Sequence, residues 1–118
     1  RTVSLAALEP GLLVAAVTGP AGLSLIAIDA AGAASLLALY PSRHAEDAAL
    51  ADGLVCLAEG VRGLSIIDVR RPRQPRRVSS SDLDYALAAA VGGDHAFVID
   101  RRGLSVVRLI VPSWLSGR

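Results

Sequence analysis

Aromatic residues and cysteine are scarce in this chain of 118 residues, and three common residue types are missing. It has one Trp, one Phe, two Tyr and one Cys, and no Lys, Met or Asn, so that all twelve basic residues are Arg. A lone cysteine, Cys56, excludes an internal disulfide, and the apolar run at 54–58 predicts a buried, unreactive thiol. No apolar run approaches the ~20 residues that span a bilayer as a helix. The apolar core must therefore come from Leu, Val, Ile and Ala.

The remaining composition is that of a globular protein, with 53% hydrophobic and 19% charged residues. A net charge of +1 gives no general attraction to nucleic acid or acidic membranes. The use of Arg without Lys indicates a GC-rich genome. Because the chain lacks Met and begins inside an expected strand, we expect it to be part of a longer or processed protein.

A repeat organises the whole sequence. The tripeptide Gly-Leu-Ser occurs at 22–24, 63–65 and 103–105, at spacings of 41 and 40 residues. Each copy opens a β-rich run, at 25–28, 66–69 and 106–109. Since internal repeats define repeat architectures, this period is the main evidence for the fold.

The repeat extends on both sides of the tripeptide. Upstream, the runs 13–17, 54–58 and 95–99 align with one another, which places a one-residue deletion in the third turn, between Asp100 and Gly103. Each of these runs follows a stretch of small apolar residues, at 4–11, 48–53 and 88–93, and further strands are expected downstream at 34–40 and 76–80. Turn signals such as Asp-Gly at 52–53 and Gly-Gly at 92–93 separate the runs. Each copy therefore predicts four short strands.

The predicted fold is all-β, with the copies as four-stranded antiparallel blades of a β-propeller. The strands are apolar on both faces, as in sheets covered on both sides, and the Ala-rich runs suit the innermost strands. We expect one partial propeller over 1–118, with blades at about 2–42, 43–82 and 83–118. The tail at 113–115 either supplies a last strand or packs elsewhere. The alternative is a helical array, because segments 45–51 and 84–91 are rich in Ala.

One copy resembles a known repeat. Residues 63–69 read Gly-Leu-Ser-Ile-Ile-Asp-Val and are followed by Pro72 and Pro75. This pattern is similar to the LVIVD repeat. Residues 97–99 with 103–107 look like the same unit, and residues 22–28 are a weaker copy of it. The resemblance implies propeller blades, a bacterial source and, for many members, a place at the cell surface or outside the cell, although the sequence leaves the compartment open. The family shares no catalytic residues, so none is transferred.

Three blades form an incomplete ring, because closed propellers use about four to eight. Two apolar blade faces would then be bare, which indicates a partner surface. We expect a second copy of the chain, or another chain or segment of a parent protein, to complete the ring.

The loop at 70–77 holds five arginines in eight residues. The candidate partner-binding residues are Arg70, Arg71, Arg73, Arg76 and Arg77. Arg binds carboxylates and phosphates through its planar fork, so an acidic protein surface is one expected partner and a merely solvated loop is the alternative. The missing aromatics argue against nucleic acid.

No residue pattern predicts catalysis, a cofactor or a metal. His44 and His95 have no metal-ligand spacing, and the acids at 29, 68 and 100 stand at strand ends, where they hydrogen-bond turns. The serines at 24, 65 and 105 recur, which favours a turn role over a nucleophile. The sequence thus predicts a non-enzymatic interaction or scaffold module. The alternative is a fragment of a larger propeller enzyme or processed protein whose active residues lie elsewhere.

Overall fold

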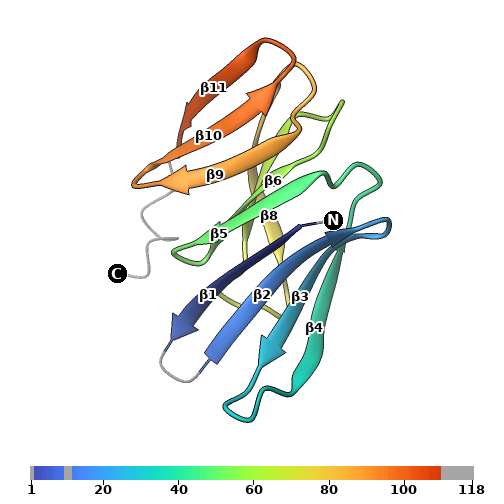
Figure 1. The fold of residues 1–118 in the computed structure, drawn as a ribbon, viewed down its shortest axis with the longest axis vertical. Coiled ribbons are helices and arrows are strands. Elements are labelled where there is room, and N and C mark those ends of the chain that lie inside the picture. Colours follow the sequence, from blue (N-terminus) through green and yellow to red (C-terminus); the bar gives the residue numbers. More distant parts are fainter. Residues whose placement is uncertain (1, 10–11, 110–118) are drawn as a thin grey trace.

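The structure, a computed structural model, describes residues 2–9 and 12–109. In these residues the chain is all β, and its strands form three antiparallel sheets (Figure 1). The N-terminal sheet contains β1 (Val3–Glu9), β2 (Leu12–Gly19), β3 (Gly22–Ile28) and β4 (Ala34–Pro41). The middle sheet contains β5 (Asp47–Ala51), β6 (Leu54–Ala58), β7 (Leu64–Asp68) and β8 (Arg76–Ser81). The C-terminal sheet contains β9 (Ala88–Gly92), β10 (His95–Asp100) and β11 (Gly103–Arg108).

Each sheet is a meander in which strands pair in chain order. Eleven of the twelve expected strands fall within the described residues, and all eleven are present. The helical alternative is wrong, because its Ala-rich segments fall on or beside β5 and β9. Ala is a good helix former, but here the flanking Gly turns and neighbouring strands override that preference. The candidate last strand in the tail lies, beyond residue 109, outside the described residues, so the described C-terminal sheet has three strands.

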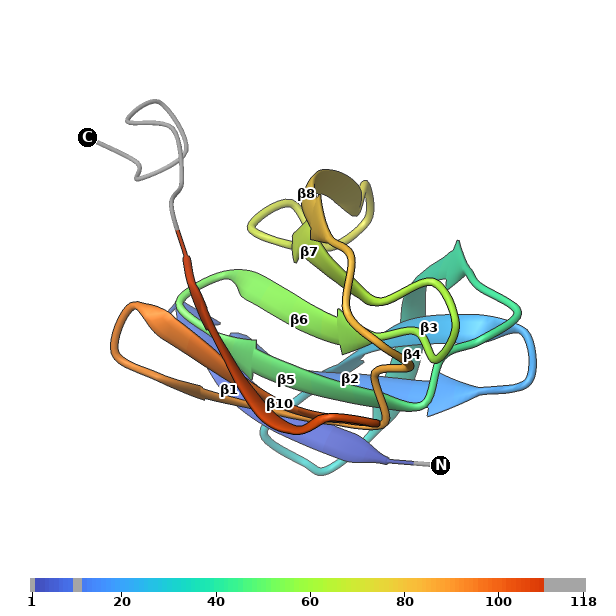
Figure 2. The same cartoon turned by 90° about the horizontal axis from the view of Figure 1, so that it is seen from above.

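The sheets follow one another along the long axis of the molecule, which measures 43 × 34 × 20 Å (Figure 1). Their first strands lie side by side, because β5 contacts both β1 and β9. Figure 2 shows β7 and β8 on the side of the molecule away from β1 and β5. The Ala-rich runs thus lie on or beside strands that contact one another between neighbouring sheets.

Packing gives each sheet two distinct faces. We call the face toward the next sheet in the sequence the forward face, and the face toward the preceding sheet the rear face. One core joins the forward face of the N-terminal sheet, including Val14 and Leu25, to the rear face of the middle sheet, including Leu57 and Ile67. A second core joins the forward face of the middle sheet to the rear face of the C-terminal sheet in the same manner. The same kind of contact thus occurs twice.

Strand register corrects the alignment of the three copies. The serine of the tripeptide pairs with Val17, Leu57 and Val98 in the three sheets, whereas the sequence alignment matched Val17 with Ala58 and Ile99. In the second turn three residues, 60–62, lie between Glu59 and its bonded partner Gly63. In the first and third turns only two residues lie between the last paired residues of the two strands. The one-residue difference is therefore an insertion in the second turn. A shift of one residue moves side chains to the opposite face of a strand. The correction therefore decides which residues share a face.

Candidate interaction surfaces

The forward face of the C-terminal sheet is uncovered and apolar. Its large side chains are between 38% and 64% exposed, namely Phe97, Ile99, Leu104 and Val106. The equivalent positions in the middle sheet are buried in the second core, at Cys56, Ala58, Leu64 and Ile66. The forward faces of the N-terminal and middle sheets are both covered by the next sheet. An exposed apolar cluster such as the one on the C-terminal sheet is typical of an interaction site.

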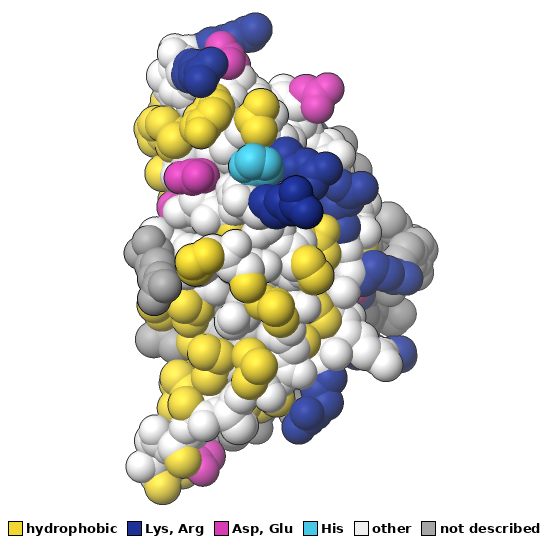
Figure 3. Space-filling view, turned by 90° about the vertical axis from the view of Figure 1, so that its right-hand side faces the viewer, with side chains coloured by type: hydrophobic (Ala, Val, Ile, Leu, Met, Phe, Trp, Pro, Cys, Tyr) yellow, Lys and Arg dark blue, Asp and Glu magenta, His cyan; other side chains and the backbone are white. Residues whose placement is uncertain are grey.

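The rear face of the N-terminal sheet is the second uncovered face. Leu13, Leu36 and Leu39 are between 36% and 63% exposed on it. The last two lie on β4, at positions where β8 of the middle sheet has Arg77 and Ser80. On the rear face of the N-terminal sheet the apolar surface therefore extends onto the last strand, β4, whereas in the middle sheet the same positions of the last strand, β8, are polar. Figure 3 views the molecule from the right of Figure 1 and shows hydrophobic side chains over much of that side, with basic side chains at its top and toward its right-hand margin.

The basic loop joins β7 to β8, two strands of the middle sheet that lie away from the converging first strands. Its first arginine is held in place: the Arg70 backbone N–H donates to Asp68 Oδ1 at 3.0 Å, and Arg70 Nε lies 3.3 Å from the same oxygen. The Arg70 side chain also lies against Gly53, where an added Cβ would overlap with it. Arg71, Arg73 and Arg77 are exposed. Three of the five predicted arginines, Arg70, Arg71 and Arg73, thus lie in the loop, and Arg70 is partly engaged within the chain. The prediction of a loop over 70–77 is wrong at its end, because Arg76 and Arg77 pair with β7 as the first residues of β8.

The serines of two copies each bind a carboxylate, and one of these, Glu59, was not singled out by the sequence. Ser65 Oγ donates to Glu59, whose other oxygen accepts a bond from Ser42 Oγ at 2.7 Å. Glu59 is buried, so these hydroxyls provide the partners that a buried carboxylate requires. In the C-terminal sheet, Ser105 Oγ donates to Asp100 Oδ2 at 2.7 Å. Glu59 and Asp100 occupy the same position, since each is the last residue before the turn that leads to the tripeptide. An acid at this position in two copies was the sequence signal that could have identified Glu59.

The same position in the N-terminal sheet is Gly19, so Ser24 has no carboxylate at this point. Ser65 and Ser105 therefore bond to the carboxylate that precedes the turn of their own sheet, which agrees with the predicted structural role, and this bond is not made by Ser24.

Three predicted acids cap turns within separate sheets. Asp29 Oδ1 accepts bonds from the backbone N–H groups of residues 31 and 33, both at 2.9 Å. Asp68 and Asp100 accept from the backbone N–H two residues ahead, at 3.0 and 2.9 Å. The three acids belong to different sheets, and the structure does not bring them together as an acid–base pair.

The two histidines lie in different environments. His95 Nδ1 is 2.7 Å from Asp94 Oδ1, and Asp94 also lies 3.7 Å from Arg108 Nε. The backbone N–H of His44 donates to Ser42 Oγ at 3.3 Å. In the described ranges, no three His, Cys, Asp or Glu side chains gather as a metal-binding group.

Cys56 is fully buried in the second core, as its apolar surroundings predicted. Burial raises the pKa of its thiol to about 11. Because the thiolate is the reactive form, this thiol is inert at neutral pH.

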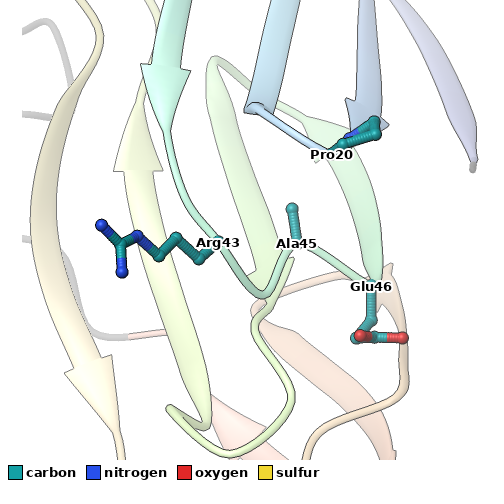
Figure 4. Close-up of a pocket in the computed structure, with 5 residues that line it drawn as sticks. Pro20, Arg43, Ala45 and Glu46 are labelled. Carbon is teal, nitrogen blue, oxygen red and sulfur yellow. The ribbon is translucent and has the colours of Figure 1, made fainter.

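A shallow hollow of about 270 Å³ lies beside the turn between β2 and β3. It is lined by Gly19, Pro20, Arg43, Ala45 and Glu46 (Figure 4). The side chains of Arg43 and Glu46 point in different directions, and neither is aimed at Pro20. Binding sites for small molecules need a few polar groups that converge on the ligand. This hollow lacks that convergence.

Within the described part of the chain, no helix has the length and apolar character to cross a membrane. A comparison with protein-family models finds no match, and a comparison with curated proteins finds no similar sequence. The functional argument therefore rests on the two uncovered sheet faces and the basic loop.

Proposed function

We propose that the chain is a non-enzymatic interaction module: three blades of a LVIVD-type β-propeller whose ring is completed by another chain or segment. Each of the three sheets is a blade in this proposal. The first strands, which contact one another, form the inner wall of the ring, and β4 and β8 form its outer rim. The basic loop on that rim offers a second surface, suited to an acidic protein, because exposed guanidinium groups bind carboxylates in a planar, bidentate manner.

The uncovered forward face of the C-terminal sheet is the observation that carries the proposal. Its four large apolar side chains stand where the other two sheets place buried residues. In the other two sheets the forward face packs against the rear face of the next sheet. The forward face of the C-terminal sheet is therefore suited to the same contact with the rear face of a further blade. A propeller closes by repeating that contact, and it uses about four to eight blades to do so.

Particle mass tests this proposal. The chain, at 12.1 kDa, is measured by sedimentation velocity both after isolation from its own cells under native conditions and after purification to homogeneity. We expect a heavier particle in at least one of the two preparations, and we expect Leu104→Asp to reduce it to the single chain. The matched control is Val61→Asp, which changes an exposed apolar residue in the β6–β7 turn, away from both uncovered faces. A 12.1-kDa particle in both preparations, with no binding of an apolar dye, would falsify the proposal.

A further inference from the structure

The two uncovered faces are complementary halves of a single kind of contact. The contact occurs twice within the chain, and each time a forward face packs against a rear face. What remains open is one forward face, on the C-terminal sheet, and one rear face, on the N-terminal sheet. A single chain therefore carries both halves of the missing contact, at its two ends.

The open rear face has the same residue types as the rear faces that are covered. In the middle sheet the buried rear positions include Val55, Leu57, Ser65 and Ile67. In the C-terminal sheet they are Ala96, Val98, Ser105 and Val107, and in the N-terminal sheet they are Ala15, Val17, Ser24 and Ile26. In the N-terminal sheet Ala15 is buried and the other three are half-buried, next to the exposed leucines of the same face. All three faces place a small or β-branched residue first, then a Val or Leu, then Ser, then a β-branched residue. The open face is therefore suited to a forward face of the same repeat.

From these observations we infer that two copies of this chain associate head to tail. The forward face of the C-terminal sheet of each copy covers the rear face of the N-terminal sheet of the other. This inference rests on the proposed function and names the partner that completes the ring. Two copies related by a two-fold axis contain two such contacts and six sheets, a number within the usual range of closed propellers.

The contact between copies lacks one feature of the contacts within the chain. In the chain, Ser4 Oγ accepts a bond from Leu50 N–H at 3.0 Å, and Asp47 Oδ2 accepts one from Ala89 N–H at 2.9 Å. Each bond joins the first strand of one sheet to the first strand of the next. The C-terminal sheet has Ala88 and Ala90 at the equivalent positions. Because alanine offers no side-chain acceptor, we expect the two copies to separate on dilution while each chain stays folded.

Two charge variants and their mixture test the head-to-tail arrangement. Leu104→Asp places a carboxylate on the open forward face, and Ser24→Asp places one on the open rear face. The purified wild-type chain should sediment at about twice 12.1 kDa at high concentration. Each variant alone should associate roughly 100-fold more weakly, because a buried, unpaired carboxylate is strongly disfavoured.

Mixing the two variants should restore pairing in part, since one intact forward face then meets one intact rear face. That recovery also shows that both variants are folded. Ser24→Ala, which keeps the rear face neutral, and Val61→Asp should pair like the wild type.

Several results would overturn the inference. If Ser24→Asp pairs normally while Leu104→Asp does not, the copies meet forward face to forward face. If the mass grows past two copies with concentration, the contact repeats without closing. If the purified chain is a monomer while the particle isolated from cells is heavier, a different chain completes the ring, and the proposed function stands without this pair. If both preparations are monomeric, the proposed function fails as well.

Discussion

The middle and C-terminal sheets are copies of one repeat, yet they differ in burial. In the middle sheet, four of the five residues of β6 and four of the five residues of β7 are buried. In the C-terminal sheet, β10 alternates between buried and open positions, and β11 has no fully buried residue. The difference arises from neighbours, because the middle sheet lies between two others and the C-terminal sheet has one covered face. Residues at the same repeat position in the two sheets therefore form matched pairs that differ in burial but little in local sequence.

The largest expected contrast is between the leucines of the tripeptide. Leu64 is fully buried, whereas Leu104 is 64% exposed. Leu64→Ala should lower the free energy of unfolding by about 2–5 kcal/mol, because it removes buried methyl groups and leaves a cavity. Leu104→Ala should change it by less than about 0.5 kcal/mol under conditions where the chain is a monomer. Urea denaturation of both variants measures the contrast, and equal losses would show that the C-terminal sheet is covered.

The glycines of the tripeptide give the next contrast. Gly63 has φ 82°, and a Cβ there would overlap with the Ser81 carbonyl oxygen. Gly103 has φ 115° and no described atom within 4 Å of such a Cβ. Gly63→Ala should therefore cost about 2–3 kcal/mol, and Gly103→Ala about 1 kcal/mol, because only the first combines backbone strain with a close approach. Thermal melting of both variants tests the ranking. A larger loss for Gly103→Ala would point to another strand packed beside it.

The serines should differ by a smaller amount. Ser65→Ala leaves buried Glu59 with the Ser42 hydroxyl as its remaining side-chain partner and should cost about 1–3 kcal/mol. Ser105→Ala removes a partly exposed bond to Asp100, whose carboxylate water can then solvate, and should cost about 0.5–1 kcal/mol. Unfolding of both variants in urea at pH 7 compares them. If the two losses are equal, burial does not set the strength of these bonds.

The comparison expected to affect the fold least is between the reactivities of two thiols. Burial raises the pKa of Cys56 to about 11, and its equivalent, Phe97, lies on the open face. A Phe97→Cys thiol, in a chain that also carries Cys56→Ala, should react with a thiol reagent at pH 8 roughly 100-fold faster than native Cys56. Comparable rates would mean that the open face is covered.

The pH dependence of stability follows from the same thiol. Above pH 9.0 the unfolded chain releases the Cys56 proton while the folded chain retains it until about pH 11. Stability should therefore fall as the pH rises from 9 toward 11 and should be unaffected by this group below 9. Cys56→Ala should flatten this part of the profile in urea titrations. A fall of the same size in that variant would assign the dependence to other groups.

Short-range patterns predicted much of the fold, because strands and turns are set by neighbouring residues. The residues of β6 and the capping by Asp29, Asp68 and Asp100 agree with the expectations. The alignment was wrong by one residue because it was made from apolar strands, which match almost as well when shifted. Glu59 was missed for a different reason, because its partner Ser42 is distant in sequence and the bond between them forms only when two sheets meet.

The sequence by itself determined the repeat, the strand order within each copy and the turn chemistry, because these depend on residues a few positions apart. It also placed Arg70, Arg71 and Arg73 on a loop, whereas Arg76 and Arg77 belong to β8. Only the tertiary structure decided which side of each strand is forward and which is rear, since that depends on strand register across the insertion at residues 60–62. It also decided that one copy of the tripeptide leucine is buried and another is open. Burial is a property of packed sheets, and identical local sequences acquire it only from the sheets beside them.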